Sequence, residues 1–120
     1  MTTVDRRRGY WDRVKETLSA SERRNYQSRW LGRLLEHAWG QAPGVRRRLE
    51  RVGLGPGDFR GEEDLARLPV IKKGEMPDLQ AADPPFGGFC TVPLSRIRKI
   101  FVSPGPIREP MGPELSAWHG

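Results

Sequence analysis

The chain has 120 residues, of which 36% are apolar, with a mean hydropathy of −0.67 and a formal net charge of +6 at neutral pH. This length and composition allow one modest domain with a small core, and no apolar run approaches the roughly 18 residues that a membrane-spanning helix needs. The single cysteine excludes an internal disulfide framework, and no apolar segment follows the early arginines as a secretory signal requires, so we expect a cytoplasmic protein.

The basic charge is concentrated in the first part of the chain. Residues 1–51 contain 13 Lys/Arg and 6 Asp/Glu, a net charge of +7, whereas residues 52–120 have a net charge of −1. Such asymmetry can mark contact with nucleic acid or an acidic partner. A water-exposed, arginine-rich helical surface is the simpler interpretation, and we favour it.

A helix is predicted over about residues 20–39. Ser19 and Glu22 have the spacing of a capping box, in which each side chain bonds the backbone N–H of the other residue. Apolar residues then recur at helical spacing, and Gly40 provides a stop. We expect the three leucines of this stripe to be buried, with its tryptophan beside them in the core. The stripe consists of Tyr26, Trp30, Leu31, Leu34, Leu35 and Ala38.

Shorter helices are predicted downstream. A second helix begins at Pro43, which suits a first helical turn, and ends at Gly53. Residues 62–68 predict a short helix with acidic residues in its first turn, and residues 72–79 predict another.

From residue 84 onward the pattern changes to loops and short strands. Residues 86–89 predict a loop, and residues 90–93 and 97–102 predict strands. Residues 114–118 could begin a last helix. Helices first and strands later predict an α+β fold. The expected regions are a helical unit over residues 1–83 and a strand-and-loop segment over residues 84–120.

The residue types that most often carry chemistry are scattered. His37 and His119 are far apart and Cys90 stands alone, so we expect no metal site and no catalytic nucleophile. Cys90 is better interpreted as a small buried apolar residue. The consecutive carboxylates Glu62 to Asp64 are best explained as charges at a helix N-terminus.

The other tryptophans suggest an interaction surface. Trp11, Trp39 and Trp118 are hard to bury in so small a chain, and large exposed aromatic residues concentrate at interfaces. We therefore expect a protein partner, a missing C-terminal region or self-association through this apolar and tryptophan-rich surface. A nucleic-acid partner is less favoured because no aromatic residue alternates with the basic run.

Several short segments along the chain together resemble a known protein family. In chain order they are Tyr10 to Asp12, Glu16 to Leu18, Leu34 to Ala38 with Pro43 and Arg47-Arg48, Asp58-Phe59, Glu63 to Pro69, Lys73, Pro85 to Gly87, Val92-Pro93 and Ile97 to Val102. Their order and spacing resemble the N-terminal region of phenylacetate–CoA ligase-like proteins, which belong to the adenylate-forming superfamily. The resemblance extends over residues 10–118 and implies the N-terminal part of the ligase large domain.

The resemblance places Ser103 to Pro110 on the family's phosphate loop, which reads Ser-Ser-Gly-Thr-Thr-Gly-Lys-Pro. Ser103, Gly105 and Pro110 match, whereas prolines and an isoleucine replace the inner hydroxyl residues. Proline has no N–H to donate, and Glu109 would repel a phosphate. Ser103, Gly105 and Arg108 are therefore the candidate cofactor-binding residues of a degenerate phosphate loop.

For the family, the resemblance implies ATP-dependent adenylation of an aryl or acyl acid and thioester formation with CoA, using ATP, Mg²⁺ and CoA. The acid pocket, the adenine contacts and the late catalytic lysine of the family lie downstream of the matched region. We expect this chain to bind no cofactor, to have no catalytic residues and to be inactive alone. The alternatives are a stand-alone interaction subunit that docks to a ligase-like partner, or a basic nucleic-acid-binding module.

Overall fold

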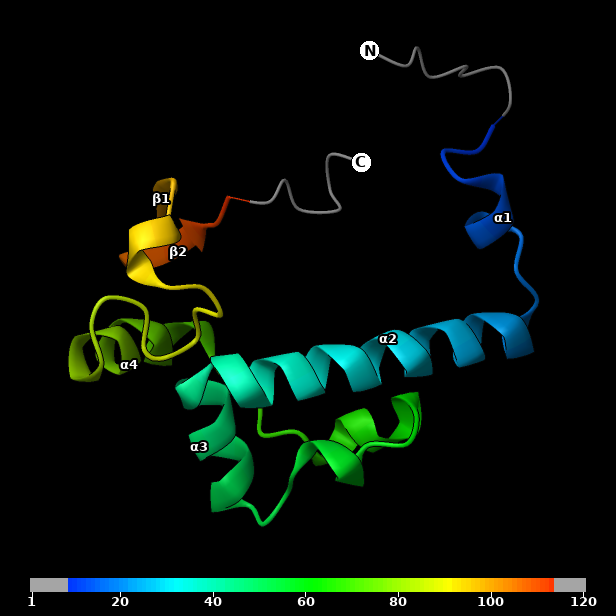
Figure 1. Ribbon diagram of the computed structural model, residues 1–120, viewed down its shortest axis with the longest axis horizontal. Helices are drawn as coiled ribbons and strands as arrows, with labels where there is room; N and C mark the ends of the chain where they lie inside the picture. The colour runs from blue at the N-terminus through cyan, green and yellow to red at the C-terminus, as the bar shows by residue number, and fades with distance from the viewer. Residues whose placement is uncertain (1–8, 114–120) are drawn as a thin grey trace.

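The computed structural model describes residues 9–113, in which helices come first and a small sheet comes last (Figure 1). This order confirms the predicted α+β class. The α-helices are α1 (Arg13–Glu16), α2 (Ala20–Gln41), α3 (Pro43–Arg51) and α4 (Met76–Ala82). The strands are β1 (Lys99–Ser103) and β2 (Ile107–Met111), and short 3₁₀ helices η2 to η5 occupy Pro56–Asp58, Glu62–Arg67, Lys73–Glu75 and Leu94–Arg96. The division into two regions at residue 83 stays a prediction.

Local signals determine both ends of α2. The Ser19 hydroxyl accepts from the backbone N–H of Glu22 at 3.3 Å, and the Glu22 carboxylate accepts from the backbone N–H of Ser19 at 2.9 Å, which confirms the capping box. The helix continues past Gly40, the predicted stop. It ends one residue further on because a residue before proline disfavours helical angles, and Ala42 is extended ahead of Pro43.

A small core lies where the second half of α2 meets α3 and the segment after η2. Leu35 contributes from α2, Leu49 from α3 and Phe59 from the residue after η2, and all three side chains are buried. Five half-buried side chains pack around them. These are Leu31, Trp39, Val45, Leu54 and Leu68.

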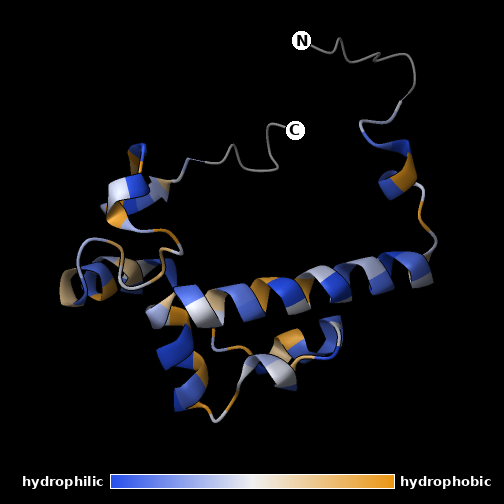
Figure 2. Ribbon diagram, viewed as in Figure 1, coloured by the Kyte–Doolittle hydropathy of each residue, from blue (hydrophilic) through white to orange (hydrophobic). Residues whose placement is uncertain are grey.

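The predicted burial of Leu34 and Trp30 is wrong, because their exposed fractions are 62% and 51%. The apolar stripe spans two neighbouring lines on α2, one through Leu31 and Leu35 and one through Trp30 and Leu34. Consecutive residues lie about 100° apart around a helix, and the elements that contact α2 cover the Leu35 side. Figure 2 shows the apolar residues of α2 as isolated bands between hydrophilic turns.

The tryptophans also differ from the prediction. Trp39, expected at a surface, packs half-buried against the core, and the Arg46 guanidinium lies 5.2 Å from its ring centroid. Trp11 is 72% exposed and agrees with the expectation of a large exposed aromatic residue. Trp118, His119 and the helix predicted at 114–118 lie outside the described residues.

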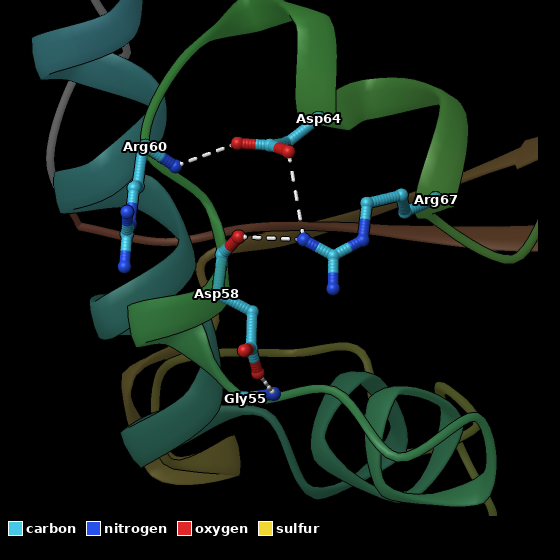
Figure 3. A network of polar contacts seen from close by, with 5 residues as sticks. All are labelled: Gly55, Asp58, Arg60, Asp64 and Arg67. Carbon is cyan, nitrogen blue, oxygen red and sulfur yellow. Dashed lines mark hydrogen bonds and ion pairs between the residues drawn. The ribbon is translucent and has the colours of Figure 1, made fainter.

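Hydrogen bonds around η2 and η3 fix the two neighbours of Phe59, Asp58 and Arg60 (Figure 3). The Asp58 carboxylate accepts from the backbone N–H of Gly55 at 2.7 Å, and the Asp58 carbonyl accepts from the Arg67 guanidinium at 2.9 Å. Arg67 also lies 3.5 Å from the Asp64 carboxylate. The backbone on both sides of Phe59 is thereby fixed by polar groups at the surface of the core.

The turn at residues 86–89 joins the helical core to α4 and the sheet. The backbone N–H of Gly44 donates to the Gly88 carbonyl at 2.8 Å, and a Cβ atom at Gly44 would collide with the backbone of this turn. Arg47 of α3 pairs with Asp83 at 2.6 Å beside this contact. Phe86 of the turn and Ile107 of β2 are buried apolar side chains.

The sheet is an antiparallel hairpin of β1 and β2 with Ser103 paired to Ile107 and Lys99 to Met111. The predicted strand at residues 97–102 is therefore present, shifted to 99–103. The strand predicted at residues 90–93 is wrong, because that segment has no regular secondary structure and no strand pairs with it among residues 9–113. A strand needs a ladder partner, and Pro93 has no N–H to offer one.

The fold is extended for its length. The radius of gyration of the Cα atoms is 17.1 Å, whereas a compact chain of 120 residues has about 14 Å. A small core and an extended shape leave large apolar side chains at the surface, among them Trp11, Val14, Leu34 and Phe101.

Candidate functional site

The predicted phosphate loop is the turn of the β-hairpin. Ser103 is the last residue of β1, Gly105 lies at the middle of the turn and Arg108 is the second residue of β2. Gly105 has φ +145°, a backbone conformation that favours glycine, so the Pro-Gly-Pro sequence suits a tight turn. The three candidate residues thus lie close in sequence on one hairpin.

Few of their hydrogen-bond donors face outward. The Ser103 hydroxyl is buried and has no hydrogen-bond partner among the described residues, and the Arg108 backbone N–H donates to the Gln80 side chain at 2.9 Å. Pro104 and Pro106 have no N–H. The Gly105 amide and the exposed Arg108 guanidinium are the donors of the turn that an anion could reach. Two separate donors cannot surround a phosphate as a nest of consecutive amides does.

Gln80 was not among the predicted site residues, although it determines how the hairpin is held. Its side chain is 2% exposed, accepts from the Arg108 N–H and donates to the Arg108 carbonyl at 2.8 Å. One side-chain amide on α4 therefore bonds β2 as a neighbouring strand would. The sequence signal was its position four residues after Met76, on the same face of α4 as an apolar residue.

A cavity of about 540 Å³ lies between α4, the turn at residues 86–90 and β2. Its lining is mostly apolar and includes Met76, Phe86 and Phe89. Lys73, the family-matched lysine, and Arg108 also line it. Glu109 lines it as well, so both charge signs are present at the edge of a mostly apolar hollow. A hollow of this kind can hold an apolar group.

The remaining candidate residues, His37, Cys90 and Glu62, lie in other parts of the fold. His37 is exposed on α2, and the half-buried Cys90 thiol donates to the Val92 carbonyl at 3.3 Å. Glu62 pairs with Arg24 of α2 at 3.1 Å. Among residues 9–113, no group of three or more histidine, cysteine or acidic side chains could hold a metal ion.

Several arginines of the basic first half have partners in the fold. Arg24 pairs with η3 and Arg47 with Asp83, and Arg46 lies 2.8 Å from Glu50 and over the Trp39 ring. These contacts place the guanidinium groups at the edges of packed elements. No helix within residues 9–113 has the length and apolar character needed to cross a membrane.

Comparisons with known proteins point to one group of enzymes. No protein-family model matches the chain. The chain is 36% identical over 95 residues to phenylacetate-coenzyme A ligase of Thermus thermophilus and 33% identical over 95 residues to that of Escherichia coli. Each match covers 79% of this chain but only 20% and 21% of those relatives, so the chain spans about a fifth of their length.

Solved structures give the same result for the fold. An open conformation of 2-hydroxyisobutyryl-CoA ligase, in complex with 2-HIB-AMP and CoA, superimposes with a TM-score of 0.82 at 35% sequence identity. The match covers 94% of this chain and 24% of that ligase. The postadenylation state of the same ligase, with R3-HIB-AMP, gives a TM-score of 0.80 over 87% of this chain.

Proposed function

The chain belongs to the phenylacetate–CoA ligase-like family of adenylate-forming proteins, and from this premise we propose that it corresponds to the N-terminal portion of an AMP-forming acid–CoA ligase. We further propose that this portion is not catalytically competent alone. The observation that carries the proposal is that the match covers most of this chain but only about a fifth of each curated relative.

The chemistry supports the same proposal. Acid–CoA ligation joins a carboxylate to the α-phosphate of ATP with release of pyrophosphate, and the CoA thiol then displaces AMP to form a thioester. Both steps need oriented donors for phosphate oxygens and a closed pocket for the acid. The described residues offer an open apolar cavity and a hairpin turn with few free donors.

We propose that this turn is a degenerate phosphate loop. Ser103 and Gly105 match the family loop, but the Ser103 hydroxyl is buried and the Arg108 amide is bonded to Gln80. Arg108 still offers a charged side chain, and Glu109 places a negative charge beside it. The turn therefore retains the serine and the glycine of the loop without its set of donors.

Exchange of radiolabelled pyrophosphate into ATP tests the absence of activity. The purified 120-residue chain is incubated with ATP–Mg²⁺ and phenylacetate, benzoate or 2-hydroxyisobutyrate, with the Thermus thermophilus ligase as a positive control. We expect the chain to match the enzyme-free blank while the control exchanges. Acid-dependent exchange above the blank would contradict the proposal.

A second candidate function is a stand-alone subunit that docks to a ligase-like partner. The exposed apolar side chains of α1 and α2, such as Val14, Trp30 and Leu34, favour this alternative because large exposed apolar residues are common at interaction sites. The genomic DNA after codon 120 distinguishes the two candidates. A reading frame that continues into ligase sequence supports the fragment, whereas a separate gene for the remaining ligase sequence supports the subunit.

A further inference from the structure

The hairpin turn has few backbone amides that can bind a ligand. Pro104 and Pro106 have no N–H, and the Arg108 N–H donates to Gln80 at 2.9 Å. The Gln80 side chain is 2% exposed, so this bond lies inside the fold. These three positions of the turn therefore offer no amide to a ligand, whatever surrounds the hairpin.

The register of the ladder accounts for the other amides. Residues paired across an antiparallel ladder alternate between pairs that bond each other and pairs whose backbone groups face outward. Arg108 faces outward to Gln80, so the pairs on either side of it bond across the ladder, and these contain the amides of residues 107 and 109. Between residues 104 and 109, the Gly105 amide is thus the one backbone donor left for a ligand.

The side chains of the turn do not replace the missing donors. The Ser103 hydroxyl is buried, and Ile107 has no hydroxyl. The exposed side chains of Arg108 and Glu109 carry opposite charges, so together they add no net positive charge to the turn. A ligand that carries several negative charges therefore gains little from this turn.

The two steps of acid–CoA ligation place different demands on such a turn. In the first, the acid carboxylate attacks the α-phosphorus of ATP, the bond to the β-phosphate breaks, and pyrophosphate leaves with most of the negative charge. In the second, the CoA sulfur bonds the acyl carbon, the bond from that carbon to the adenylate oxygen breaks, AMP leaves with the electron pair, and the thiol proton passes to solvent. Oriented donors stabilise the charge that develops on pyrophosphate. The second step involves no β- or γ-phosphate.

We infer that this turn separates the two steps in the ligase to which the chain corresponds. It does not support the formation of an acyl adenylate from ATP, and it leaves intact the conversion of a preformed acyl adenylate and CoA into a thioester and AMP. This role rests on the proposed function. A separate reaction that condenses a carboxylic acid with ATP must then supply the acyl adenylate.

A loop graft tests this role in a complete ligase. The phosphate loop of the Thermus thermophilus ligase is replaced by Ser-Pro-Gly-Pro-Ile-Arg-Glu-Pro, and the matched control graft carries Pro104→Ser and Pro106→Thr within the same segment. Two rates are measured, which are acid-dependent exchange of pyrophosphate into ATP and thioester formation from synthetic phenylacetyl-AMP and CoA. We expect the graft to lower exchange by about 100-fold or more and to keep thioester formation within about threefold, while the control graft regains part of the exchange.

Equal loss of both rates overturns the inference, and so does exchange that survives the graft. If the graft does not fold, a single replacement of the loop lysine by glutamate, at the position aligned with Glu109, brings in the charge without constraining the backbone. This variant should lower exchange more than thioester formation, and an equal effect on both rates overturns the inference. Exchange by the isolated 120-residue chain would instead remove the proposed function, so the two failures are distinguishable.

Discussion

Gln80 shows how much of this fold depends on a single polar side chain. It is the buried polar residue between α4 and the hairpin, and it satisfies two backbone groups of Arg108. A backbone group that loses its partner in a partly buried place has a desolvation cost, so its removal is felt beyond the lost contact. The position of the candidate loop therefore depends on a residue 28 positions away.

Replacing Gln80 should loosen the hairpin. We expect Gln80→Ala to lower the free energy of unfolding by about 1–3 kcal/mol, because both groups of Arg108 lose their partner. Urea unfolding measures this change, and hydrogen exchange of the β2 amides locates it. The matched control is Gln27→Ala on the exposed surface of α2, which should change stability by less than about 0.5 kcal/mol. Equal effects of the two substitutions would contradict the assigned role.

Leu34 and Leu35 provide a second matched pair. We expect Leu35→Ala to lower the free energy of unfolding by about 2–5 kcal/mol because the side chain is buried in the core. Leu34→Ala should cost less than about 0.5 kcal/mol because that side chain is largely exposed. Urea unfolding of both variants measures the two changes in the free energy of unfolding. A larger loss for Leu34→Ala than for Leu35→Ala would place the core on the other side of α2.

At the scale of elements, prediction succeeded where the signals were local. The capping box of α2 and the proline that opens α3 depend on neighbouring residues, so the sequence alone contains them. The burial of Leu34 and the strand at residues 90–93 depend on which elements lie opposite. Periodicity identifies an apolar stripe, but only packing decides which side of it is covered.

The capping box should make the stability of α2 depend on pH. Hydrogen bonds from the Ser19 hydroxyl and then from its backbone N–H lower the pKa of Glu22. A lowered pKa in the folded state means that the contribution is present above the unfolded pKa and is lost as pH falls through the folded value. We therefore expect Glu22→Gln to reduce the loss of thermal stability between about pH 5 and 3.

The control for this prediction is Glu36→Gln. Glu36 is exposed on the same helix and makes no side-chain hydrogen bond within the described part of the chain. Melting curves of the wild type and both variants at several pH values provide the comparison. Identical acid sensitivity of wild type and Glu22→Gln would show that the box contributes nothing through ionisation.

At the scale of the whole molecule, the candidate site was predictable in position but not in surroundings. Ser103, Gly105 and Arg108 were found from the loop sequence, and the hairpin turn lies where the strand-to-turn change indicated. The pairing of the Arg108 amide arises from a contact with Gln80 of α4. No pattern within the loop could reveal this contact, because Gln80 lies 28 positions away.

The prolines of the loop can be replaced without changing the buried residue of the hairpin. In the double variant Pro104→Ser and Pro106→Thr, two backbone N–H groups and two hydroxyls are added to the exposed turn, while the buried Ile107 is kept. Calorimetric titration with ATP–Mg²⁺ should give a dissociation constant weaker than about 1 mM for the wild type and for the control Pro93→Ser, in which an exposed proline outside the turn is replaced. The double variant should bind about tenfold more tightly, because each added hydrogen bond contributes about 0.5–1.5 kcal/mol. Sub-millimolar binding by the wild type would refute the degenerate loop, and an unchanged affinity in the double variant would show that the prolines are not what weakens it.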